Sequence, residues 1–395
     1  MQIGLVGKPS SGKSTFFKSA TLADVEIANY PFVTIKPNHG VGFVSIECAD
    51  KEFKTQCNPR FGSCQNHERF VPIDMIDVAG LVVGAHEGKG MGSEFLDDLN
   101  QADALIHIID ISGSVNDKGE PCKPLEYDPV KDVKFLETEL DMWYLRILKK
   151  GWDRFKRQIS QEKTDNYKSI AKQMSGVRVT EEIVKDTITE LKIDNDLRNW
   201  NEKELKGLAR MLRIKTKPMI IAANKVDVIG AEKNLERIKK EFPEYIIIPC
   251  SAVSELALKE AEKKKAIEYT PGHDNFKIIN VNKEQEKGLE YIKENVLKKF
   301  NNTGVQKILN TIVFDVLKYK AIFPGGLNNL KDKDGNVLPD CFLLPENSTA
   351  LDFAFKLHTD IGKGFIKAID VKKRTSIGKD ITLKHGDVIE IKTSA

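Results

Sequence analysis

Short apolar runs separated by polar and glycine-containing segments organise the N-terminal part of the chain. Runs of this length predict β-strands. They lie at residues 3–6, 70–76, 104–110, 219–223 and 245–248. A helix is predicted over residues 13–20, directly after the first strand. Strands that alternate with helices in this way predict an α/β fold with a doubly wound sheet.

A long segment separates the strands at 104–110 and 219–223, although a single helix would suffice to join them. Within it, apolar side chains recur at three- and four-residue steps at Val133, Leu136, Leu140, Trp143 and Ile147. Further helical runs lie near 181–193 and 203–212. We therefore expect a helical insertion over about residues 112–216 that forms an antiparallel arm. Its apolar stripe either packs the arm on itself or offers a contact surface to a large partner.

The hydrophobic pattern changes near residue 319. Residues 255–318 are predicted to be helical and to complete a first domain of residues 1–318. Short β-rich runs follow at 341–344, 365–371 and 388–392, around one helix at 349–358 for which Ser348 is the candidate N-cap. Strands around one helix predict a small β-grasp, ubiquitin-like domain over residues 319–395.

Composition narrows the class of protein. With 395 residues, 41% of them hydrophobic and 30% charged, the chain can build the cores of roughly two or three domains. A formal net charge of +3 does not by itself indicate nucleic acid. No apolar stretch has the length of a transmembrane helix and no signal peptide is apparent, so we expect a cytoplasmic protein with no membrane or DNA partner.

A phosphate-binding loop follows the first strand and fits the pattern G-x-x-x-x-G-K-[ST]. It comprises Gly7, Lys8, Pro9, Ser10, Ser11, Gly12, Lys13, Ser14 and Thr15. Backbone N–H groups of such a loop, together with the N-terminus of the next helix, bind phosphate oxygens. Lys13 supplies a positive charge to the β- and γ-phosphates, and the Ser14 hydroxyl ligates Mg²⁺.

Two further motifs are typical of a nucleoside triphosphate site. Asp77 begins the sequence Asp-Val-Ala-Gly after the strand at 70–76 and would hold the Mg²⁺ shell through water, while the Gly80 N–H meets the γ-phosphate. Thr34, which lies before that strand, would donate its hydroxyl to Mg²⁺ in the triphosphate state. We predict Lys13, Thr34 and Gly80 as catalytic residues, and Ser14, Thr34 and Asp77 as metal ligands.

The identity of the base is predicted from two later segments. Asn224 and Lys225 begin the motif Asn-Lys-Val-Asp, and the Asp227 carboxylate at its end can accept hydrogen bonds from guanine N1–H and N2–H₂. Adenine lacks this pair of donors and would leave the carboxylate unpaired. A backbone N–H at Ser251 or Ala252 can meet guanine O6. Five motifs in this order, each at the carboxyl end of a predicted strand, predict GTP as the substrate.

The sequence resembles the Obg-related GTPases, and among them the YchF/Obg-like ATPase branch of archaeal type. The resemblance rests on residues 30–34 (YPFVT) and 77–92 (DVAGLVVGAHEGKGMG) and covers nearly the whole chain. It implies a G domain with a helical insertion, a C-terminal TGS domain and an association with ribosomes or translation. The ATPase members lack the guanine-reading aspartate present here as Asp227, which favours GTP. Potassium-stimulated relatives usually carry Asn where this chain has Ser10, so we do not expect activation by K⁺.

Hydrolysis cannot use the glutamine that orients water in Ras-like GTPases, because Leu81 occupies that position. Leucine neither donates nor accepts a hydrogen bond, so intrinsic turnover should be slow. His86, within the glycine-rich residues 84–92, is the candidate catalytic residue that would orient water or stabilise charge. The alternatives are an ordinary exposed loop histidine and a partner that completes the site in trans.

A ribosome or RNA is the expected macromolecular partner, through the arm and the C-terminal domain. The segments STALDFAFKLH and HGDVIEIKT are similar to the TGS domain, which accompanies nucleotide-binding proteins that work with RNA. Residues 363–379 contain six cationic side chains and only one acidic side chain, that of Asp370. This excess of positive charge suits a nucleic-acid phosphate backbone. The six cations are Lys363, Lys367, Lys372, Lys373, Arg374 and Lys379. In the arm, Trp152 and Phe155 lie among cations, a pattern that suits either RNA stacking or a solvated helix face.

The cysteines do not form a recognisable disulfide or metal framework. Six of them are scattered at positions 48, 57, 64, 122, 250 and 341. Cys57, Cys64 and His67 would need a fourth zinc ligand, for which Cys48 is the nearest candidate, and their spacing is not a usual zinc pattern. We expect free thiols.

These observations predict a Mg²⁺-dependent GTPase that acts as a molecular switch. The γ-phosphate would order Thr34 and residues 80–92, and hydrolysis to GDP would release them. Two other hypotheses are an ATPase of the YchF type that acts outside translation, and an RNA-binding adaptor whose nucleotide is only structural.

Overall fold

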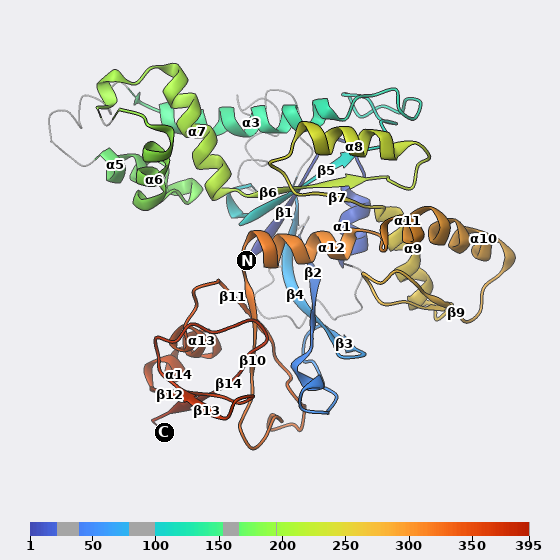
Figure 1. Cartoon of the computed structure of the whole chain (residues 1–395), viewed down its shortest axis with the longest axis vertical. Helices are drawn as coiled ribbons and strands as arrows, with labels where there is room; N and C mark the ends of the chain where they lie inside the picture. The colour runs from blue at the N-terminus through green and yellow to red at the C-terminus, as the bar shows by residue number, and fades with distance from the viewer. Residues whose placement is uncertain (22–38, 79–98, 153–165, 195, 395) are drawn as a thin grey trace.

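A computed structural model describes the chain except for residues 22–38, 79–98, 153–165, 195 and 395 (Figure 1). Among the described residues, the larger sheet has seven strands in the order β2-β4-β1-β5-β6-β7, with β3 paired to β4. The strands are β1 Gln2–Val6, β2 His39–Glu47, β3 Ser63–Gln65, β4 Glu68–Asp77, β5 Ala104–Asp110, β6 Met219–Asn224 and β7 Ile247–Pro249. Strand β4 and strands β1, β5, β6 and β7 pair in parallel, whereas β2 and β3 run antiparallel to β4. The predicted doubly wound α/β sheet is confirmed.

Helices cover both faces of this sheet. Their bounds are α1 Lys13–Thr21, α3 Val130–Lys149, α7 Glu202–Thr216, α8 Ala231–Glu241, α9 Ala252–Lys263 and α12 Val305–Asn310. Apolar side chains of α1, α9 and α12 form one buried cluster with one face of the sheet, while α3, α7 and α8 pack on the other face. Every residue of β5 is buried, as expected for a central parallel strand.

The predicted insertion forms a helical arm in which α3 packs along α7. Helix α5 (Asn166–Gln173) and helix α6 (Glu181–Leu191) complete it at one end of the molecule (Figure 1). The apolar stripe of α3 faces the interior of the arm, because Leu136, Leu140 and Trp143 are at most 3% exposed. The stripe therefore packs against other helices of the arm and against the sheet, and it is not an exposed contact surface for a partner.

The hypothesis that Trp152 stacks on RNA is wrong for this structure. Its side chain is 8% exposed and stacks on Trp200, with 5.9 Å between the ring centroids and 24° between the ring planes. A ring buried in this way is not available to a base. Phe155, the other aromatic residue of that segment, lies outside the described residues.

A helical region and a small ribbon connect the arm and sheet to the C-terminal domain. The helices are α10 Lys283–Ile292 and α11 Lys298–Phe300, and the ribbon pairs β8 Ile267–Glu268 with β9 Lys277–Ile278. Residues 293–297 and 311–316 continue α10 and α12 as π-helical turns. The helices predicted between 255 and 318 are therefore present. None of the helices within the described ranges is long and apolar enough to cross a membrane.

The C-terminal domain is a five-stranded sheet in the order β11-β10-β14-β12-β13, packed on α13. Its elements are β10 Lys320–Pro324, β11 Phe342–Leu344, α13 Ala350–Leu357, α14 Thr359–Lys363, β12 Phe365–Asp370, β13 Thr375–Ile377 and β14 Val388–Thr393. The predicted β-grasp architecture is confirmed. The N-cap of α13 is Thr349 and not Ser348, because the Thr349 hydroxyl accepts from Asp352 N–H while the Asp352 carboxylate accepts from Thr349 N–H.

Candidate nucleotide site

The phosphate-binding loop joins the end of β1 to the start of α1 at the centre of the sheet. Two of its glycines are required because neighbouring groups lie too close to leave room for a side chain. A Cβ on Gly7 would lie 2.4 Å from the Ile108 carbonyl oxygen, and a Cβ on Gly12 would lie 2.2 Å from Asn224 Nδ2. Gly12 also has a φ of +94°, in the left-handed region that favours glycine. The loop is thus pressed between β5 and the base-reading motif.

The residues predicted to meet phosphate and Mg²⁺ lie together where described. Lys13 Nζ is 2.9 Å from Asp77 Oδ1, so the lysine predicted to contact phosphate and the aspartate predicted to hold the metal are neighbours. Ser14 is exposed in the first turn of α1. Thr34, Gly80 and His86 lie outside the described residues, so their roles stay predictions.

Asn224 fixes the phosphate-binding loop against the start of α9. Its side-chain Nδ2 donates to the Ser11 carbonyl oxygen at 3.0 Å, and its Oδ1 accepts from Ala252 N–H at 3.0 Å. Asn224 is 3% exposed, so these two hydrogen bonds satisfy a buried amide. This contact brings together the first and the last motifs predicted from the sequence, at residues 7–15 and 250–252.

Lys225 connects the Asn-Lys-Val-Asp motif to the phosphate-binding loop and to the end of β5. With a left-handed φ of +65°, it directs its Nζ to the Ser10 carbonyl oxygen at 3.0 Å and to Asp110 Oδ2 at 2.9 Å. Asp110 is fully buried at the end of β5 and was not among the predicted site residues. Asp110 could have been predicted from its position, because it ends a buried parallel strand that lies between β1 and β6, the strands that the phosphate-binding loop and Asn224 follow or end.

Asp227 is the residue that the sequence predicts to read the base. Its Oδ1 is buried and has no hydrogen-bond partner among the described residues, whereas its backbone carbonyl accepts from the Tyr291 hydroxyl at 2.8 Å. A buried carboxylate oxygen without a donor is costly unless a ligand supplies one.

The backbone N–H groups predicted for guanine O6 have partners inside the protein. Ser251 N–H donates to the Thr303 carbonyl oxygen at 2.8 Å, and Ala252 N–H donates to Asn224 Oδ1. The Ser251 hydroxyl caps α9 by accepting from Ser254 N–H. A contact between either N–H and O6 would therefore require an exchange or a sharing of these bonds.

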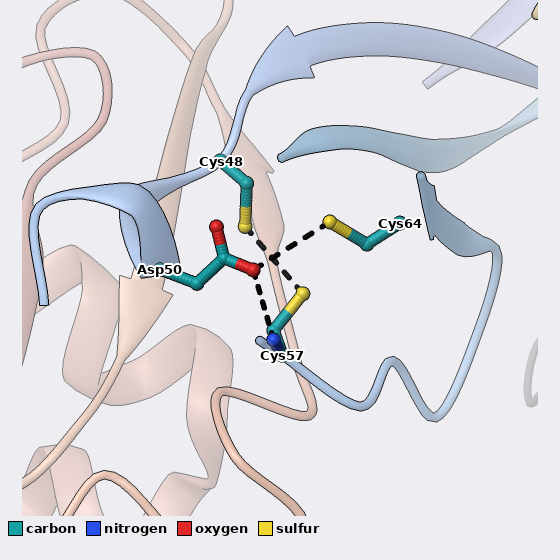
Figure 2. A group of neighbouring side chains, drawn as sticks. All are labelled: Cys48, Asp50, Cys57 and Cys64. Atoms are coloured by element: carbon teal, nitrogen blue, oxygen red, sulfur yellow. Dashed lines mark hydrogen bonds between the residues drawn. The ribbon is translucent and has the colours of Figure 1, made fainter. Parts of the chain in front are cut away.

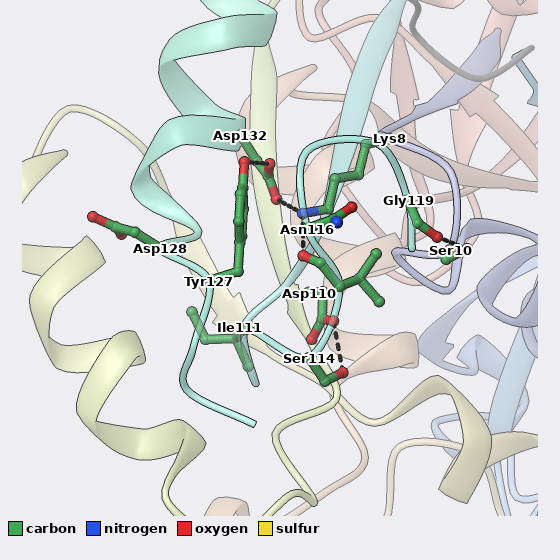
Figure 3. A network of polar contacts seen from close by, with 12 residues as sticks. Lys8, Ser10, Asp110, Ile111, Ser114, Asn116, Gly119, Tyr127, Asp128 and Asp132 are labelled. Carbon is green, nitrogen blue, oxygen red and sulfur yellow. Dashed lines mark hydrogen bonds and ion pairs between the residues drawn. The ribbon is translucent and has the colours of Figure 1, made fainter. Parts of the chain in front are cut away.

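The side chain of Lys8 points away from the loop's concavity and into the base of the arm (Figure 3). Its Nζ is 2.9 Å from Asp132 Oδ2 and 2.8 Å from the Val115 carbonyl oxygen, and it lies over the Tyr127 ring at 3.7 Å from the centroid. The Tyr127 hydroxyl in turn donates to Asp132 Oδ1 at 2.8 Å. Burial raises the pKa of Asp132, and the charge of Lys8 opposes that rise. The Lys8 side chain thus holds the arm, and any contribution to phosphate binding falls to its backbone.

The segment between β5 and α3 also covers the outer side of the loop. Ser10 Oγ donates to the Gly119 carbonyl oxygen at 2.9 Å, and a Cβ on Gly119 would lie 2.8 Å from Pro9 Cβ (Figure 3). The Ser10 hydroxyl, at the position where potassium-stimulated relatives carry Asn, therefore already has a partner. The amino-acid sequence does not predict this contact, because it depends on how the chain folds back after β5.

Comparisons with known proteins place the chain in a family. Residues 2–137 match the family model of the 50S ribosome-binding GTPases, residues 222–325 match the Obg-like GTPase YGR210-like, G4 motif-containing domain, and residues 331–393 match the TGS domain. A GTP-binding protein of Methanocaldococcus jannaschii is 48% identical over 397 residues, covering 100% of this chain and 99% of that protein. The chain belongs to the YchF/Obg-like family of P-loop GTPases.

Two further relatives of this YchF/Obg-like protein differ in the nucleotide for which they are named. The crystal structure of a GTP-binding protein from Pyrococcus horikoshii OT3 matches with a TM-score of 0.78 and 37% identity, covering 100% of both chains. The ribosome-binding ATPase YchF of Mycoplasma genitalium is 28% identical over 99% of both proteins. The resemblance predicted from residues 77–92 and from the C-terminal domain is therefore confirmed, and relatives named for GTP and for ATP both occur.

Proposed function

We propose that this YchF/Obg-like protein binds GTP in preference to ATP and hydrolyses it to GDP and phosphate. The observation that carries the proposal is Asp227, whose buried Oδ1 has no donor among the described residues. Guanine presents N1–H and N2–H₂ side by side and can satisfy this carboxylate. Adenine presents no such pair, and an unpaired buried carboxylate disfavours it by several kcal/mol, on the order of the 10⁴-fold discrimination such sites reach.

Mg²⁺ is the metal that this site would hold, and its chemistry would be to neutralise charge on the β- and γ-phosphates. The carboxylate of Asp77 and the exposed hydroxyl of Ser14 are hard oxygen donors of the kind Mg²⁺ prefers. Lys13, now paired with Asp77, would contact phosphate when nucleotide binds. Thr34 as a further ligand and His86 as the group that orients water complete the proposal. A switch follows if the γ-phosphate orders the segments that carry these residues.

The ribosome is the proposed partner of the switch. The family model matched by residues 2–137 is described as a ribosome-binding GTPase, and the Mycoplasma relative carries ribosome binding in its name. The TGS domain presents a cationic segment at residues 363–379. Lys372 is paired with Glu52 and Lys373 with Asp370, so the contact with phosphate would fall mainly to the other four cations.

Titration calorimetry tests the choice of nucleotide. Wild-type protein with Mg²⁺ should bind GTP at least 100-fold more tightly than ATP, and Asp227→Ala should lose most of that difference. Equal affinities, or a preference for ATP, would overturn the proposal in favour of a YchF-type ATPase. Tight GTP binding without turnover, with and without ribosomes, would instead favour an RNA-binding adaptor whose nucleotide is structural.

A further inference from the structure

Three thiols and a carboxylate converge in the connection between β2 and β4 (Figure 2). Cys48 follows β2, Asp50 lies in the 3₁₀ turn Ala49–Lys51, Cys57 lies in the loop after it, and Cys64 lies in β3. One ligand atom from each of the four residues lies within 4.8 Å of the other three. Cys48 and Cys57 are at most 3% exposed and Asp50 is fully buried. The side chains come from the 3₁₀ turn with its N-cap, from the loop after it and from β3, and they point toward one centre.

The distances suit a tetrahedral metal site and not a disulfide. Cys48 Sγ and Cys57 Sγ are 3.5 Å apart, far beyond the roughly 2.05 Å of an S–S bond. Cys64 Sγ is 3.7 Å from Asp50 Oδ2. Two sulfurs that each lie about 2.3 Å from one zinc ion at a tetrahedral angle are separated by about 3.8 Å. These two separations therefore need to change by only a few tenths of an ångström, and the other ligand atoms lie within 4.8 Å of one another.

The charges around the centre also suit a cation. Asp50 Oδ2 accepts from Cys57 N–H at 2.8 Å, and Asp50 Oδ1 is 2.9 Å from His67 Nδ1. A buried carboxylate beside three thiols is costly unless positive charge compensates it. Arg69, only 1% exposed, provides part of that charge and directs its Nη1 to Cys57 Sγ at 3.4 Å. Ligating carboxylates are generally hydrogen-bonded by groups of the outer shell, and His67 is placed to be such a group for Asp50.

We propose that Cys48, Cys57, Cys64 and Asp50 bind one Zn²⁺ ion through three thiolates and one carboxylate oxygen. His67 orients Asp50 from the outer shell and does not contact the metal. Four protein ligands close the coordination sphere, so the site is structural and not catalytic. The site is not evident from the sequence, because eight residues separate Cys48 from Cys57 and six separate Cys57 from Cys64. Usual zinc motifs contain short C-x₂₋₄-C pairs.

The position of the site indicates what the metal would stabilise. Arg69 also donates to the carbonyl oxygens of Leu338 and Pro339, at 3.1 and 2.8 Å. Directly after Cys57, Asn58 N–H donates to the Val337 carbonyl oxygen at 2.9 Å, and Arg60 N–H donates to that of Pro339 at 2.9 Å. Residues 48–64, here called the zinc loop, are therefore part of the surface of the G domain on which the TGS domain rests. Zinc would fix the relative position of the two domains, independently of nucleotide.

Metal analysis of full-length protein tests the site. Protein purified without a metal-chelating column and under reducing conditions should contain one equivalent of zinc by mass spectrometry. Cys57→Ser and Cys64→Ser should each lose it. Cys122→Ser should keep it, because Cys122 lies outside the cluster and contacts the Gly113 carbonyl oxygen. Retention of one zinc by Cys57→Ser and Cys64→Ser would overturn the assignment.

Cobalt substitution tests the ligands even where a variant folds poorly. Chelator-treated wild-type protein loaded with Co²⁺ should show a thiolate-to-cobalt charge-transfer band and the intense visible bands of a tetrahedral site. Asp50→Asn should weaken Co²⁺ affinity at least tenfold, and His67→Ala should change it less. The weak spectrum of hydrated Co²⁺ with wild-type protein would overturn the proposal. A Cys48–Cys57 disulfide, detected by mass after alkylation without reduction, would do so as well.

Discussion

Lys8 in the phosphate-binding loop and Asp132 in the first turn of α3 form a buried ion pair, with 2.9 Å between Nζ and Oδ2. Both side chains are 6% exposed. The pair joins the loop that is predicted to hold phosphate to the first helix of the arm. A displacement of this loop upon nucleotide binding would therefore be transmitted to α3 through a direct contact.

Removing one member of this pair should destabilise the protein strongly. Asp132→Ala leaves the Lys8 ammonium buried with no carboxylate, which typically costs about 3–5 kcal/mol of the free energy of unfolding. Urea titrations measure it. Glu241→Ala, which breaks the exposed pair with Lys134, is the matched control and should cost less than about 1 kcal/mol. The double variant Lys8→Met/Asp132→Leu should recover much of the loss. A cost for Asp132→Ala as small as that of the control would contradict the account.

Asn224 should control nucleotide affinity without reading the base. Asn224→Ala removes the hydrogen bonds to Ser11 and Ala252, each worth roughly 1 kcal/mol, and frees the phosphate-binding loop. We expect at least a tenfold loss of affinity for both GTP and GDP by calorimetry, with the preference over ATP retained. Asn234→Ala, which removes the hydrogen bonds to the Ile111 carbonyl oxygen and from Arg237, serves as the control and should bind normally. Unchanged affinity in Asn224→Ala would refute this role.

His107 should make the protein less stable in mild acid. It is fully buried in β5, where burial, and secondarily the charge of Lys8, lower its pKa to about 3. The ordinary value is about 6.5, so between these values the unfolded chain binds a proton that the folded chain does not. Lowering the pH from 7 to 5 should then cost about 2 kcal/mol through this residue alone. Urea titrations of wild type and His107→Gln at both pH values measure it, and an identical pH dependence would contradict the prediction.

Trp152 should matter for the stability of the arm and not for contact with RNA. Trp152→Ala removes a buried ring that stacks on Trp200 and should cost about 3–5 kcal/mol. Hydrogen exchange should become faster in α5, α6 and α7, while Trp152→Phe should retain most of the protection. A variant of full stability that has lost ribosome binding would show that the ring contacts the partner after all.

Local patterns predicted the parts of the site that lie at the ends of parallel strands. The loop at residues 7–15, Asp77 and Asn224 each follow an apolar run, and parallel strands place their carboxyl ends along one edge of a sheet. The order of the motifs then identified the family. The β-grasp domain was predicted from three of its five strands and from helix α13, whose periodicities are distinct, whereas the short strands β10 and β13 and the helix α14 were not predicted. Its helix cap was misplaced by one residue, since Ser348 and Thr349 are both chemically competent.

The contacts that sequence analysis missed join segments that are far apart in the chain. Nothing local indicates that Lys8 meets Asp132, or that Trp152 packs on Trp200. Strand β2 was missed as well, because Gly40 and Gly42 interrupt its apolar pattern and its structure depends on antiparallel pairing with β4. The convergence of Cys48, Cys57 and Cys64 also depends on this pairing. Long-range packing, and not residue preference, decides each of these features.

We expect Asp227 to select the base by accepting two hydrogen bonds from guanine. Xanthine tests it most directly, because it carries a C2 carbonyl where guanine carries N2–H₂. In Asp227→Asn the side-chain amide can donate to that carbonyl and still accept from N1–H. Calorimetry should show that the variant loses GTP affinity at least 100-fold and gains affinity for xanthosine triphosphate by a similar factor. A variant that keeps GTP affinity and does not respond to xanthosine triphosphate would show that Asp227 does not read the base.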